Sequence, residues 1–231
     1  MSATRQIGAI IKKDVIAELR TKEMVVTMVL FVLIIMVAFH FGFGETKDFA
    51  PFAGGLIWIA FLFASTLGLN RSFVHEKDEG CLEGLLLAPV DRPNIFFGKM
   101  LGNLIFLTIV EIIAVPLYLG MLNLSVNGSV PLFVGAIVLG NIGICTVGTL
   151  LSTISVNSKM RDMLLPVIYL PIMTPILMTA VIATNGAMAG FVGKDGPQMY
   201  AQVMSAMKLL AVYDIIFLLV AYALYDFVIG E

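Results

Sequence analysis

Long, continuously apolar runs alternate with short polar segments along this chain. Each run reaches or approaches the roughly 20 residues with which a helix crosses the hydrocarbon core of a bilayer. Helices are favoured because lipid cannot satisfy exposed backbone groups, and the runs lack the alternation of a membrane β-barrel. The pattern therefore predicts an all-α integral membrane protein with six transmembrane helices. They are expected near residues 24–42, 49–70, 99–122, 132–156, 163–184 and 209–229, the last run being interrupted by Asp214 and Asp226.

The composition supports a membrane protein and excludes other classes. Of 231 residues, 59% are hydrophobic and 13% are charged, whereas soluble domains carry about 25% charged residues. The mean hydropathy is +0.99. A net charge of −2 without a basic cluster excludes a nucleic-acid partner. The two cysteines, Cys81 and Cys145, suggest neither a disulfide framework nor a metal site.

A polar, amphipathic segment precedes the first apolar run. Apolar residues recur at helical spacing in residues 1–23, between several basic residues. The segment lacks the apolar core and small-residue cleavage site of a signal peptide. We favour a helix in the membrane interface over a solvated cytosolic tail, because a membrane segment follows at once.

The positions of Lys and Arg predict the orientation. With the N-terminus inside, eleven of the 14 basic residues lie on the inner side, and only Lys47, Lys194 and Lys208 lie outside. Such a bias places both termini in the cytoplasm. The outer loops are then short: 43–48, 123–131 and 185–208. In the fifth span we expect a kink or break at Pro166, Pro171 and Pro175.

One inner loop, residues 71–98, is unusually rich in charge for this chain. Read as a helix, its residues 76–87 place three glutamates on one face and three leucines on another, ending at Pro89 and Pro93. A helix resting on the membrane would favour Lys and Arg on its polar face, whereas this face is acidic. Docking on a soluble partner is therefore the better interpretation.

The run "GGLIWIAFLFASTLGLNRSFVHEKDEGCLEGLLLAPVDRPNIFFGKML", from residue 54, carries a resemblance to a known family. It resembles the signature region of the haem exporter protein B family (CcmB), the permease-type subunit of the cytochrome c maturation system. A second similar stretch is "MLLPVIYLPIMTPILMTAVIA" at 163–183. The matching positions of the first run are Trp58, Arg71, Phe73, Glu76, Gly80, Leu82, Glu83, Leu86, Pro89 and Lys99.

The resemblance implies a type-2 ABC exporter permease with an N-terminal interfacial helix, six spans and a cytosolic coupling helix in the inner membrane. The chain has no G-x-x-x-x-G-K-[ST] loop, so ATP would be hydrolysed by a separate CcmA-like chain. Further implied partners are a CcmC-like haem-handling subunit and a small CcmD-like subunit. The coupling residues would be Glu76, Asp78, Glu79, Gly80, Leu82, Glu83, Leu86 and Pro89.

Three functions remain open. The first is a subunit for cytochrome c maturation, either exporting haem or transmitting ATP hydrolysis to release the haem-loaded chaperone. The second is an ABC-2 permease for a lipid, a peptide or a drug. The third, a stand-alone carrier, would need paired charges at mid-membrane and inverted repeats; only Glu111 lies deep, and no repeat is visible. We expect no catalytic residues and no metal site, since no hydrolytic set is visible.

Two acids within the spans are candidate functional residues. Glu111 lies near the middle of the third span, where a charge is costly. It is either functional or a protonated acid, hydrogen-bonded to Asn141, Thr146 or a carbonyl. Asp214 is expected near the outer interface, where Lys208 or Tyr213 could accompany it, and a structural anchor is favoured over a relay.

The histidines and methionines are the possible haem ligands of this chain. His40 and His75 fall on opposite membrane faces and cannot share one iron, and the 14 methionines are more simply read as packing. We expect no firmly bound cofactor, leaving haem as a transported or handed-over ligand.

Small residues at spacings of four favour close helix contact, either within the chain or in a homodimer. They are Ala60, Ala64 and Gly68, and Gly98 and Gly102.

Overall fold

The computed structural model describes residues 2–42, 50–78, 80, 84, 90–156, 161–191 and 196–228. These residues form helices, and no strand occurs among them. The helices are α1 (Ala3–Thr21), α2 (Glu23–Gly42), the short 3₁₀ helix η1 (Ala50–Phe52), α3 (Ala53–Asp78), α5 (Arg92–Met121), α6 (Val130–Val156), α7 (Arg161–Ala189) and α8 (Gly196–Val228).

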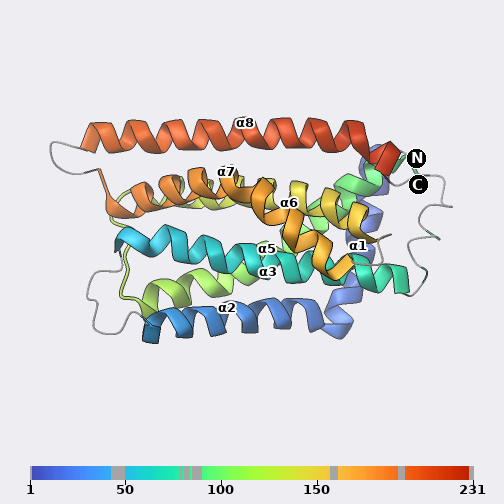
Figure 1. Ribbon diagram of the computed structural model, residues 1–231, viewed down its shortest axis with the longest axis horizontal. Coiled ribbons are helices and arrows are strands. Elements are labelled where there is room, and N and C mark those ends of the chain that lie inside the picture. The colour runs from blue at the N-terminus through green and yellow to red at the C-terminus, as the bar shows by residue number, and fades with distance from the viewer. Residues whose placement is uncertain are drawn as a thin grey trace.

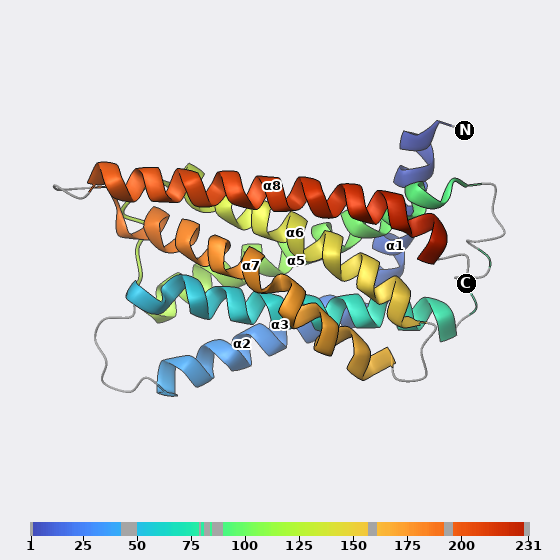
Figure 2. The ribbon, with the colours of Figure 1, turned by 45° about the horizontal axis from the view of Figure 1, so that its top comes forward.

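Six long helices, α2, α3 and α5 to α8, run side by side along the long axis of the molecule (Figure 1). The helix α1 instead runs across one end of this bundle, in both views (Figures 1 and 2). The two chain termini lie at that same end, which we call the terminal end. In the middle of the bundle, α6 packs against α3, α5, α7 and α8. More than half of the apolar part of α6 is buried, a larger share than in the other candidate spans.

Five helices are long and apolar enough to cross a membrane: α2, α5, α6, α7 and α8. A shorter apolar stretch, Ala53–Leu69, lies in α3. The protein is thus an all-α, multi-pass membrane protein, as the apolar runs predicted. A crossing by α3, and with it the count of six spans, stays a prediction.

Several helices are longer than the apolar runs, which corrects the expected loops. The third helix continues to Asp78 and α5 begins at Arg92, so the 71–98 loop shrinks to residues 79–91. The last helix begins at Gly196 instead of residue 209, and most of the expected outer loop 185–208 is helical. The reason is that a polar residue interrupts an apolar run without ending a helix, because a helix satisfies its own backbone hydrogen bonds.

Of the kink or break expected in the fifth span, the break is wrong and the kink stays a prediction. Pro166, Pro171 and Pro175 all lie inside α7, which continues from Arg161 to Ala189. Each proline removes one backbone donor, and membrane helices tolerate this loss because neighbouring helices and hydroxyl side chains satisfy the freed groups.

Candidate functional site

The acidic segment between α3 and α5 was predicted as the docking site for an ATPase. Glu76 and Asp78 lie in the last turn of α3, although their side chains fall outside the described residues. Gly80 is exposed and has a φ of +69°, a left-handed conformation that glycine adopts without strain. A continuous helix over 76–87 is therefore wrong, because α3 ends at Asp78 and Gly80 lies in a turn. Glu79, Leu82, Glu83, Leu86 and Pro89 lie outside the described residues, and their coupling role stays a prediction.

The first part of α5 packs closely on α1. An ideal Cβ placed on Gly98 would lie 2.9 Å from both Cβ and Cγ2 of Ile10, and one on Gly102 would lie 3.6 Å from Oδ2 of Asp14. Asn94 Nδ2 donates a 2.6 Å hydrogen bond to Gln6 Oε1 one turn earlier. Two rows of residues four apart thus face each other, pairing Gln6 with Asn94, Ile10 with Gly98 and Asp14 with Gly102. The Gly98/Gly102 spacing was expected to serve either packing within the chain or contact in a homodimer. The structure shows packing within the chain.

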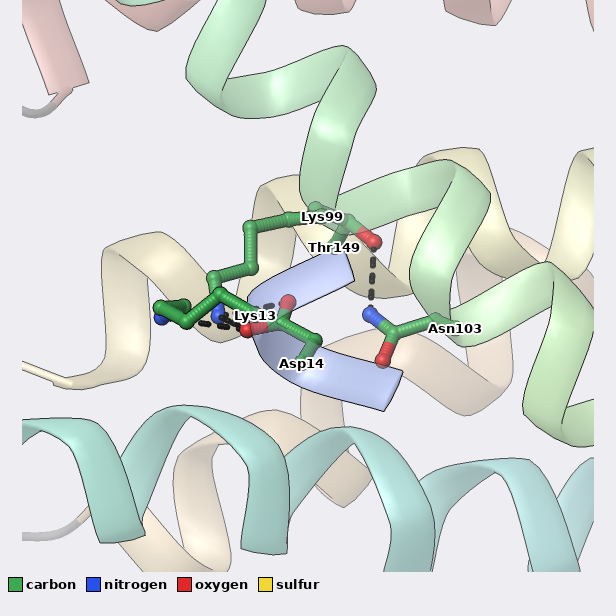
Figure 3. A network of polar contacts seen from close by, with 5 residues as sticks. All are labelled: Lys13, Asp14, Lys99, Asn103 and Thr149. Carbon is green, nitrogen blue, oxygen red and sulfur yellow. Dashed lines mark hydrogen bonds and ion pairs between the residues drawn. The ribbon is translucent and has the colours of Figure 1, made fainter. Parts of the chain in front are cut away.

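A buried ion pair joins the same two helices. Lys99 is 1% exposed, and its Nζ lies 3.0 Å from Oδ2 and 3.2 Å from Oδ1 of Asp14. Lys13 reaches the same carboxylate from α1 at 3.0 Å, and Figure 3 shows both lysines converging on it. One turn beyond Lys99, Asn103 Nδ2 donates to Thr149 Oγ1 of α6 at 3.2 Å (Figure 3). We call this group of contacts between α1 and α5 the α1–α5 junction.

Sequence reasoning missed the junction, although it left a signal. Lys99 was counted as a charge on the inner side, and Asp14 was not singled out. The glycine pair Gly98/Gly102 marks a helix face that a second backbone approaches closely. That α1 is the helix lying on this face, with Asp14 beside Gly102, is shown only by the folded chain.

The junction predicts that a side chain at Gly98 will be poorly tolerated. We expect Gly98→Ala to destabilise the chain by about 1–3 kcal/mol, because the new methyl group would overlap Ile10 and force α1 away from α5. Thermal unfolding of the full chain in mild detergent measures this. Gly55→Ala is the matched control: it is also helical, and its Cβ would meet nothing within 4 Å, so helix propensity predicts no loss of stability. Equal effects of the two substitutions would contradict the close packing.

Small residues of α3 also serve packing within the chain. Ala60 and Ala64 are buried. A Cβ on Gly68 would lie 2.7 Å from the Sδ atom of Met28 on α2. Close contact of α2 and α3 therefore accounts for Gly68, and Ala60 and Ala64 are buried within the chain.

Glu111 is buried on α5 and accepts a hydrogen bond from Asn141 Nδ2 of α6. Asn141 is one of the partners that the sequence suggested. Within the described residues, Oε1 of Glu111 has no hydrogen-bond partner. This arrangement suits an acid that takes part in helix packing, and whether it has a function stays open.

Asp214 does not lie near the outer interface, contrary to expectation. Because α8 begins at Gly196, Asp214 lies about 27 Å along the helix, near its middle. It is 4% exposed, and its Oδ1 faces Gly143 of α6, where a Cβ would lie only 2.8 Å away. Neither Lys208 nor Tyr213 accompanies it by a hydrogen bond, since both carboxyl oxygens lack such a partner in the described part of the chain.

Glu111 and Asp214 lie at nearly the same depth. Their neighbours on α6, Asn141 and Gly143, are two residues apart, about 3 Å along the helix axis. The statement that only Glu111 is deep is therefore wrong. The error arose because the predicted span began at residue 209, about three turns after the start of α8 at Gly196.

The packing of Glu111 predicts a mild phenotype for its closest isostere. Glu111→Gln should leave thermal stability nearly unchanged, because the new amide oxygen still accepts from Asn141. Glu111→Leu should cost about 1–3 kcal/mol, since it leaves the buried amide of Asn141 without its acceptor. The unfolding temperature of the full chain in mild detergent measures both effects. Equal losses of stability in the two variants would contradict a structural role for the hydrogen bond to Asn141.

The histidines occupy opposite ends of the bundle. His40 is exposed near the end of α2, where its ring lies edge-on to Phe41 at 5.4 Å. His75 lies near the end of α3, which runs back toward the terminal end (Figure 1). Because the two residues lie at opposite ends of the bundle, they cannot share one iron within a single chain.

A cleft opens at the end of the bundle opposite the terminal end. It has a volume of about 720 Å³ and is lined by the link between α5 and α6 and by the ends of α7 and α8, with amide side chains that include Asn123, Asn127 and Gln202. The link lies against α7 through two backbone bonds, from Asn127 N–H to Met188 O and from Ser129 N–H to Ala187 O. These bonds hold one wall of the cleft in place.

Comparison with known proteins identifies the family. The model of the CcmB protein family matches residues 5–224. The chain is 30% identical to heme exporter protein B of Rhodobacter capsulatus over 149 residues, 64% of this chain and 68% of the relative. It is 25% identical to heme exporter protein B of Pseudomonas aeruginosa over 172 residues, 74% and 76% of the two chains. The Escherichia coli K12 protein of the same name is 35% identical over 74 residues, 32% and 34%. Because the family match extends over nearly the whole sequence, this multi-pass membrane protein belongs to the CcmB family.

Proposed function

We propose that this chain is the membrane-spanning, permease-type subunit of an ABC complex that serves cytochrome c maturation. The family match over residues 5–224 carries the proposal, together with relatives named heme exporter protein B. The all-helical, multi-pass fold supports it. The complex sits in the inner membrane, and both termini of this chain face the cytoplasm.

ATP hydrolysis belongs to a separate, CcmA-like chain in this proposal. The sequence contains no phosphate-binding G-x-x-x-x-G-K-[ST] loop. The ATPase docks on the acidic segment 79–91, which joins the end of α3 to the start of α5. Since α5 is tied to α1 through Lys99 and Asp14, a displacement of this segment would reach α3, α5 and α1 together.

The other proposed partners are a CcmC-like haem-handling subunit and a small CcmD-like subunit. Haem is then either carried by the complex or handed over when ATP hydrolysis releases the loaded chaperone. Neither histidine of this chain is assigned as a resident haem ligand, because His40 and His75 lie at opposite ends of the bundle. The chain itself is not an enzyme in this proposal.

The test is purification of the chain from its native membranes in mild detergent, followed by mass spectrometry of stoichiometric partners. We expect an ATPase and a haem-binding membrane subunit. An ATPase without a haem-binding subunit would favour an ABC-2 permease for another substrate. Recovery of the intact chain without any ATPase would contradict the proposed function.

A further inference from the structure

The helix α1 is held in a defined orientation across the terminal end of the bundle (Figures 1 and 2). The α1–α5 junction holds one face of it. At its C-terminal end the chain turns into α2 through Lys22, which has a left-handed φ of +57°. Glu18 stabilises this corner twice: its carbonyl oxygen accepts from Lys22 N–H at 2.6 Å, and its Oε1 accepts from Val25 N–H at 2.9 Å. The direction of α1 relative to the spans is thus fixed at both places.

The face of α1 that points away from α5 carries basic and apolar side chains together. Arg5, Lys12 and Arg20 are all exposed. Ile16 and Leu19 lie among them and are 41% and 65% exposed. On a helix Arg5, Lys12, Ile16 and Leu19 fall on the side opposite Gln6, Ile10 and Asp14, which face α5, whereas Arg20 is exposed at the flank of that α5-facing side.

Both acids of α1 are engaged within the protein. Asp14 is bound by Lys99 and Lys13, and Glu18 caps the first turn of α2 through Val25. Asp14 is thus neutralised by its lysine partners, whereas Glu18 keeps its charge at the corner with α2. The exposed side chains Arg5, Lys12 and Arg20 carry three positive charges, so the exposed charge of α1 is net basic. The neutralisation of Asp14 by Lys99 is the part of this result that depends on tertiary contacts.

Such a surface, lying across the end of the spans, matches the boundary between hydrocarbon and headgroups. Basic side chains there gain from anionic lipid, and apolar side chains gain by entering the acyl region. An acidic protein surface would match the charge but would not by itself provide an apolar phase for Leu19. We propose that the exposed face of α1 binds the headgroups of anionic phospholipids through Arg5, Lys12 and Arg20, with Ile16 and Leu19 in the acyl boundary.

The first experiment titrates the delipidated full chain with phosphatidylglycerol or phosphatidylcholine and counts bound lipid by native mass spectrometry. We expect tighter binding of phosphatidylglycerol. The triple variant Arg5→Gln/Lys12→Gln/Arg20→Gln should weaken it by about fivefold per charge removed, on the order of 100-fold in all. The matched control, Lys47→Gln/Lys194→Gln/Lys208→Gln, removes the same charge from the predicted outer side and should keep the preference.

The second experiment places a nitroxide at Leu19→Cys in a Cys81→Ala/Cys145→Ala background, with the chain in phosphatidylglycerol vesicles. We expect the label to collide with oxygen, which concentrates in lipid, more than with a water-soluble nickel chelate. Three results would overturn the proposal. They are an unchanged lipid preference in the α1 triple variant, an equal loss in the control triple, or a nitroxide in water, which would point to an acidic protein partner.

Discussion

Glu83→Lys combined with Leu86→Asp should abolish co-purification of the ATPase subunit while leaving the chain inserted in the membrane. The first change reverses one of the negative charges of the segment between α3 and α5, and the second places a charge among its leucines. Central contacts of an interface each contribute about 2 kcal/mol or more, so two disrupted contacts predict a loss of at least about a thousandfold in affinity. Pull-down from solubilised membranes, with quantification of both chains, measures the result.

A matched control separates docking from general damage. Glu45→Lys with Phe43→Asp makes the same kinds of change in the 43–48 segment, predicted to lie on the outer side. It should leave ATPase recovery unchanged. If the Glu83/Leu86 variant is inserted normally and still recovers the ATPase in full, the segment 79–91 is not the docking site. Membrane insertion is checked separately by carbonate extraction of the variant.

Lys99→Met should lower the stability of the chain by about 3 kcal/mol. Removing one partner of a buried ion pair costs about 3–5 kcal/mol, because the other charge is left without compensation. The lower end applies here, since the Asp14 side chain is 12% exposed and keeps Lys13 at 3.0 Å. Asp14→Leu should cost more, because it leaves the ammonium group of Lys99 buried at 1% exposure. Thermal unfolding of the full chain in mild detergent measures both.

The double variant and a neighbouring lysine provide the controls. Lys99→Met/Asp14→Leu should recover part of the loss, since no isolated charge remains. Lys13→Met removes the exposed partner of the same carboxylate and should cost no more than about 1 kcal/mol, as exposed ion pairs do. Equal costs for Lys13→Met and Lys99→Met would show that burial does not govern this ion pair.

The sequence alone determined the class of the protein and its family. A run of about 20 apolar residues is a local requirement of the bilayer, so the membrane class and the regions of five spanning helices could be predicted without knowing any contact. The helix ends could not. Where α3 and α8 extend beyond the apolar run, hydropathy no longer distinguishes helix from loop, and Asp214 was placed at the wrong depth for this reason.

Tertiary structure decided which polar groups meet. In a membrane protein the lipid-facing and the core-facing sides of a helix are both apolar, so periodicity does not reveal which face meets which neighbour. The partner of Lys99, the pairing of Glu111 with Asn141 and the position of Asp214 beside Gly143 all depend on the register of adjacent helices. For the same reason only the folded chain shows that Asp14 is paired with Lys99, which leaves the exposed charge of α1 net basic.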